Sequence, residues 1–137
     1  MTFLMPPSKY NWMRISALLL GIAILIWLSF EDSDIRILLA FSSAVCLWTG
    51  IRLLYSGSSG RTGSLIFLVM IGFVVGFAVV PVAVTLMAIK SGLHAHSTAE
   101  YTGKQVQDVL VLAPVLSISG LLLGLGAGLL RIAQRGD

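Results

Sequence analysis

The chain has 137 residues, of which 57% are hydrophobic and only 11% are charged, and its mean hydropathy is +0.96. Because soluble domains carry roughly 25% charged residues, this composition excludes a disordered chain and argues strongly against a water-soluble globular domain. The net charge of +3 comes from basic residues that are scattered singly along the chain, so we expect no nucleic-acid partner.

The first apolar run extends from Ile15 to Phe30, and its 16 residues would span roughly 24 Å as a helix. Trp12 near one end and Trp27 near the other are typical of anchors at the membrane interface. No small-residue cleavage site precedes the acidic segment 31–34. We therefore expect an uncleaved spanning helix over about residues 12–31 rather than a signal peptide.

The second apolar run, Ile37 to Ile51, lies between Arg36 and Arg52, whose long side chains can reach outward to the lipid headgroups. A run of 15 residues also fits a buried helix of a soluble core, but the three companion runs favour a spanning helix over about residues 35–55. The segment 56–64 that follows is rich in Gly and Ser, and it predicts a turn.

The third apolar run, Leu65 to Ile89, has 25 residues and predicts a helix over about residues 64–91, long enough to span a bilayer with some tilt. The fourth run, Val109 to Leu130, has 22 residues and predicts a helix over about residues 103–132. The segment 102–105 that opens this helix has the Thr-x-x-Gln pattern of a capping box.

Together these four runs predict an all-α integral membrane protein, in which residues 1–137 form a single domain of four transmembrane helices in an up-down bundle. The excess of Lys and Arg marks the cytoplasmic segments of multi-pass proteins. Here the tails and the second loop hold six of the nine basic residues, so we expect both termini in the cytoplasm. These six are Lys9, Arg14, Arg52, Arg61, Arg131 and Arg135, and the other three are Arg36, Lys90 and Lys104.

Glycines recur at four-residue spacing on the third and fourth runs. Lipid gives helices no hydrophobic reason to associate, so close backbone approach at small residues is a main source of packing. Two interpretations are open: the glycines hold the helices of this chain together, or they dock a helix of another membrane protein. The residues concerned are Gly72 and Gly76 on the third run and Gly120, Gly124 and Gly128 on the fourth, with shorter small-residue pairs at Ala17 and Gly21 and at Ala40 and Ala44.

Two prolines fall inside the predicted spans. Pro81 and Pro114 each remove a backbone hydrogen bond, and we expect them to kink the third and fourth helices. Counted from the helix ends, they lie roughly 12 and 8 Å below the same membrane surface. Kinks at this depth would splay the helix ends into a shallow vestibule; the alternative is an ordinary adjustment of helix packing.

The loop between the third and fourth runs holds both histidines of the chain, His94 and His96, followed by Glu100. Two imidazoles and a carboxylate are ligands that Zn²⁺ or Cu²⁺ accepts, so these residues form a candidate metal site. The H-x-H spacing is unspecific, and the alternative is a set of polar loop residues at headgroup level or in contact with a partner. We expect no organic cofactor.

None of the four runs contains Asp, Glu, Lys, Arg or His between its flanking residues. Transporters driven by ions and enzymes within the membrane normally need such groups. We therefore expect a non-catalytic accessory, structural or assembly subunit of a larger membrane protein complex, whose partners are the lipid bilayer and other membrane subunits. The alternative is a small homo-oligomeric channel or transporter for an uncharged or lipid-like solute, lined by Ser42, Ser43, Thr49 and Ser119.

Overall fold

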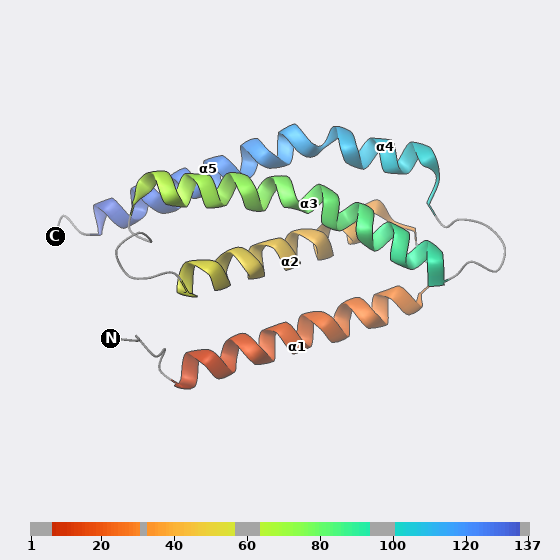
Figure 1. The fold of residues 1–137 in the computed structure, drawn as a ribbon, viewed down its shortest axis with the longest axis horizontal. Helices are drawn as coiled ribbons and strands as arrows, with labels where there is room; N and C mark the ends of the chain where they lie inside the picture. The colour runs from red at the N-terminus through yellow and green to blue at the C-terminus, as the bar shows by residue number, and fades with distance from the viewer. Residues whose placement is uncertain (1–6, 31–32, 57–63, 94–100, 135–137) are drawn as a thin grey trace. The chain divides into compact units, whose positions relative to one another are not determined.

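The computed structural model describes residues 7–30, 33–56, 64–93 and 101–134 of the chain. All regular structure in these residues is helical (Figure 1). Four helical segments are long and apolar enough to cross a membrane, and the chain is therefore a multi-pass integral membrane protein, as its composition predicts. The four segments are Asn11–Ser29, Ile35–Tyr55, Leu65–Leu93 and Gly103–Ala133.

The chain divides into two compact units, residues 1–32 and 33–137. The described part of the first unit, residues 7–30, contains the helix α1 (Pro7–Ser29), which begins earlier and ends earlier than the predicted 12–31. Its early start has a simple reason. A proline at the first helical position fits the helix backbone, and the amide hydrogen that it lacks would have no partner there.

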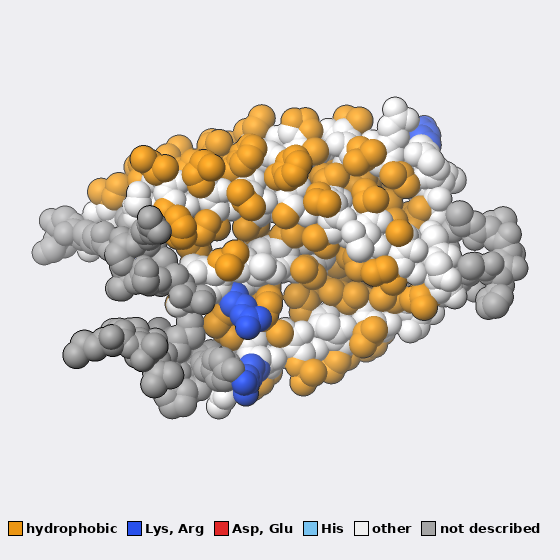
Figure 2. Space-filling view, viewed as in Figure 1, with side chains coloured by type: hydrophobic (Ala, Val, Ile, Leu, Met, Phe, Trp, Pro, Cys, Tyr) orange, Lys and Arg blue, Asp and Glu red, His pale blue; other side chains and the backbone are white. Residues whose placement is uncertain are grey.

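In the second unit, α3 (Leu65–Leu93) lies antiparallel to α2 (Ile35–Ser56) and to the C-terminal pair α4 (Gly103–Val111) and α5 (Ala113–Ala133) (Figure 1). The most extensive contact joins α3 to α5, and the next joins α2 to α3. α3 is therefore the central helix of this unit. Many large apolar side chains are exposed along the described helices (Figure 2), as expected for helices in contact with lipid.

The fourth predicted helix is interrupted at Leu112, which separates α4 from α5. Pro114 has no amide hydrogen to donate to the preceding turn, and the Leu112 amide donates to the Val109 carbonyl at 3.1 Å, a tighter turn than that of an α-helix. Regular α-helical bonding resumes where the Leu116 amide donates to the Leu112 carbonyl at 2.9 Å. By contrast, α3 continues as one helix through Pro81.

The predicted capping box at the start of α4 is confirmed. The Gln105 amide donates to Thr102 Oγ1 at 3.3 Å, and the Thr102 amide donates to Gln105 Oε1 at 2.8 Å. These two bonds satisfy amide groups that the first turn of a helix leaves without partners. The cap therefore sets the start of the fourth span at Gly103.

Candidate helix-packing interface and functional site

The glycines of α3 and α5 bring the two helices together backbone to backbone. A Cβ atom built on Gly72 would strike the carbonyl oxygen of Gly120 and lie 3.0 Å from the Cα of Gly124. A Cβ atom built on Gly120 would strike the carbonyl oxygen of Gly72 and lie 3.0 Å from the Cα of Gly76. No residue other than glycine leaves room for this approach, because the opposing atoms belong to the main chain.

The same close approach continues on both sides of this pair. A Cβ atom on Gly76 would strike the carbonyl oxygen of Leu116, and one on Gly124 would strike that of Leu68. Gly128 faces Cδ1 of the Leu65 side chain. All five glycines named from the sequence thus lie in one contact within the chain, which we call the glycine seam: Gly72, Gly76, Gly120, Gly124 and Gly128. Gly126 of α5 lies outside it, with no described atom within 4 Å of its Cβ position.

The α2–α3 contact has a close point that was not predicted from the sequence. A Cβ atom on Gly50 would lie 2.7 Å from Cγ2 of Val75. The buried stripe of α2 that ends at Gly50 includes Ser42 and Cys46. Small residues at 42, 46 and 50 repeat every four positions and so carry a signal for this contact, whereas the pair predicted from the sequence was Ala40 and Ala44. Ala40 is exposed and Ala44 only half-buried.

Hydroxyl groups along the spans bond to their own helices. The buried Ser42 donates from Oγ to the Leu38 carbonyl at 2.8 Å, and the buried Ser117 donates to the Ala113 carbonyl at 2.7 Å. The same bond to the residue four positions earlier is made by Thr49, Thr85 and Ser119, at 2.8, 2.7 and 2.8 Å. These hydroxyls are therefore satisfied without water or a neighbouring helix.

Lys90 is the largest fully buried side chain of the described residues, and its burial was not predicted from the sequence. From the sequence it counts only as one of the three basic residues outside the tails and the second loop. Lysine is almost never fully buried in proteins unless it is paired. The sequence carries a usable signal, because Gly76, Ala83 and Lys90 follow one another at seven-residue intervals, and all three lie on the buried stripe of α3.

The two prolines lie on the outside of their helices, since both Pro81 and Pro114 are exposed. The interruption at Leu112 is the local change that accompanies Pro114, while the vestibule between the two helices stays a hypothesis.

The candidate metal ligands His94, His96 and Glu100 lie outside the described residues. Within the described residues, no group of three or more His, Cys, Asp or Glu side chains is arranged to hold a metal ion.

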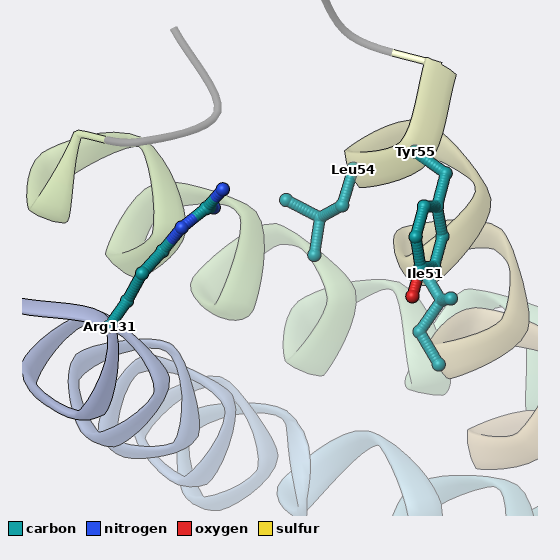
Figure 3. A pocket seen from close by; sticks show the side chains of 4 residues that line it. All are labelled: Ile51, Leu54, Tyr55 and Arg131. Carbon is teal, nitrogen blue, oxygen red and sulfur yellow. The ribbon is translucent and has the colours of Figure 1, made fainter. Parts of the chain in front are cut away.

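A hollow of about 460 Å³, which was not predicted from the sequence, opens between the C-terminal ends of α2 and α5. Ile51, Leu54 and Tyr55 line it from α2, and Arg131 lines it from α5 (Figure 3). Close by on α2, Cζ of Arg52 lies 5.4 Å from the centre of the Trp48 ring, within the range of a cation–π interaction.

Comparisons of the chain with protein-family models, with characterised proteins and with solved structures find no match.

Proposed function

We propose that the protein is a non-catalytic accessory, structural or assembly subunit of a larger membrane protein complex. The proposal rests on the contacts and hydrogen bonds that the small and polar residues make within the spans. The seam glycines pack α3 against α5, and hydroxyls on α2, α3 and α5 donate to carbonyls of their own helices. The seam glycines thus serve packing and these hydroxyls are satisfied within their own helices, and both observations support a structural subunit.

In this proposal the four helices form one up-down bundle with both termini in the cytoplasm. The distribution of Lys and Arg supports the orientation, because six of the nine lie in the tails and the second loop.

The outward face of α5 is the surface that we propose for a partner helix. The seam glycines already contact helices of the same chain, but Gly126 has open space at its Cβ position. Leu122 and Leu129 flank it and are exposed. A glycine between exposed leucines allows another transmembrane helix to approach closely, and lipid alone gains nothing from such a site.

Purification of the tagged full-length chain from its native membrane in a mild detergent, followed by native mass spectrometry, tests the proposal. We expect a complex with at least one other integral membrane protein at fixed stoichiometry. Gly126→Leu should reduce the recovered partner severalfold. The exposed Val74 of α3 offers a matched control, since Val74→Phe adds bulk elsewhere on the surface. A single chain without partners would overturn the proposed function, and equal recovery in both variants would overturn the choice of face.

The alternative, a homo-oligomeric channel or transporter, needs polar groups along a path. Of the hydroxyls named for that path, those of Ser42, Thr49 and Ser119 already donate to their own helices, and this supports the packing role instead. Flux of neutral solutes into proteoliposomes separates the two functions, because a structural subunit should give no movement above that of empty vesicles.

A further inference from the structure

The hollow between α2 and α5 combines an apolar wall with a cation. Ile51 and Leu54 supply aliphatic side chains, and Tyr55 adds an aromatic ring with a hydroxyl group. In Figure 3 the Arg131 side chain extends from α5 on the opposite side of the hollow from these α2 residues. The volume of about 460 Å³ falls within the roughly 300–1,000 Å³ of pockets that hold organic ligands.

The hollow lies where two spanning segments end. The second span ends at Tyr55 and the fourth at Ala133, so the hollow is at the depth where acyl chains meet headgroups. A ligand at this place is drawn from the bilayer itself, and it must present an apolar part and a polar part together.

The charges near the hollow indicate which polar group the ligand carries. In the described residues 51–56 and 131–134, the charged side chains are Arg52 and Arg131, and neither segment contains Asp or Glu. A guanidinium has five N–H donors in a planar fork that matches phosphate, so Arg131 can bind a phosphate in addition to contacts within the protein. Basic pockets between transmembrane helices are suited to anionic headgroups.

We propose that this hollow is a binding site for one anionic glycerophospholipid. Its phosphate binds the Arg131 guanidinium, and one acyl chain lies against Ile51 and Leu54. Net negative charge on the headgroup favours this lipid over a zwitterionic one, because Arg131 lines the hollow and Arg52 follows the lining residue Ile51 on α2. The site needs no protein partner and stands independently of the proposed assembly function.

The test uses the full-length protein in a neutral detergent, titrated with phosphatidylglycerol or phosphatidylcholine and followed by native mass spectrometry. We expect one phosphatidylglycerol to bind at concentrations at which phosphatidylcholine does not. Arg131→Gln should weaken this binding at least about fivefold, since a cation at the membrane surface contributes about 1 kcal/mol. Lys104→Gln is the matched control, because it removes an exposed cation from the other end of the same span.

A second variant separates the hollow from general surface charge. Leu54→Trp places a larger side chain in the hollow and leaves the charge of the protein unchanged. It should also weaken phosphatidylglycerol binding severalfold. Circular dichroism should show unchanged helix content for all three variants. Equal binding of the two lipids, equal effects of Arg131→Gln and Lys104→Gln, or no effect of Leu54→Trp would each overturn the proposal. So would displacement of the lipid by glycerol 3-phosphate at equal concentration, because the acyl chain would then contribute nothing.

Discussion

Gly72 and Gly120 are reciprocal neighbours, because a Cβ atom on either would strike the main-chain carbonyl oxygen of the other. A flexible side chain can turn away from an added methyl group, but a helix backbone cannot do so locally. Any larger residue at either position must therefore push α3 and α5 apart. This pair is therefore a point of the glycine seam at which any larger residue separates the two helices.

Gly72→Ala and Gly120→Ala should each lower the free energy of unfolding by about 1–3 kcal/mol, the usual cost of forcing extra bulk into a well-packed contact. Reversible unfolding in detergent micelles by added sodium dodecyl sulfate, followed by circular dichroism, measures the change. Gly126→Ala is the matched control, since Gly126 lies on the same helix with no described atom within 4 Å of its Cβ position. We expect it to stay within about 0.5 kcal/mol of the native chain. Equal losses at Gly120 and Gly126 would contradict the seam.

Lys90→Ala should lower the free energy of unfolding by about 2–4 kcal/mol, because it removes a fully buried four-carbon stem and leaves a cavity. Lys90→Met keeps most of the buried volume and should cost less than Lys90→Ala in the same unfolding assay. If the two variants were equally destabilised, the ammonium group rather than the packing of the stem would be the source of stability.

Thr102→Ala should lower the free energy of unfolding by about 1 kcal/mol through loss of the cap of α4. Amide hydrogen exchange provides a local measurement, because the Gln105 amide donates to Thr102 Oγ1 and should exchange faster in the variant. Thr102→Ser keeps the hydroxyl group and should retain slow exchange. Protection of Gln105 that survives Thr102→Ala would show that the cap does not hold this turn.

The proposed orientation predicts opposite labelling at the two ends of the fourth span. In a Cys46→Ala background, Lys104→Cys should react with a membrane-impermeant maleimide in sealed right-side-out vesicles. Gln134→Cys should react only after the vesicles are permeabilised. Both positions are exposed, so the barrier to labelling is the membrane rather than the fold. The reverse pattern would place the termini on the outer side.

The helices were predictable because they depend on local properties of the chain. In lipid the backbone must satisfy its own hydrogen bonds, so each long apolar run becomes a helix, and α2 and α3 begin and end within two residues of the predicted positions. The Thr102 cap was likewise readable, since all its atoms belong to four consecutive residues. The four-residue spacing of the glycines indicated a packing face, and the geometry adds which atoms oppose one another.

Features that depend on pairing between distant segments were not predictable in the same way. The burial of Lys90 depends on the helices that pack against α3, whereas the sequence shows it only as one of the nine basic residues. The close point at Gly50 requires Val75 of another helix, and the hollow requires that Arg131 lie near Leu54. The proline pattern predicted a kink at Pro114 but not the separation of α4 from α5 at Leu112.

The glycine seam also affects which mutations this chain tolerates and how much conformational entropy is lost when its helices pack. Contacts made by main-chain atoms require no side chain to give up rotamer freedom, so bringing α3 and α5 together carries a small entropy cost. The same property means that no substitution at Gly72 or Gly120 is conservative, because each one adds atoms at positions that carbonyl oxygens already occupy. A core of leucines can be repacked by compensating changes, whereas this contact admits one residue type at each of its central positions.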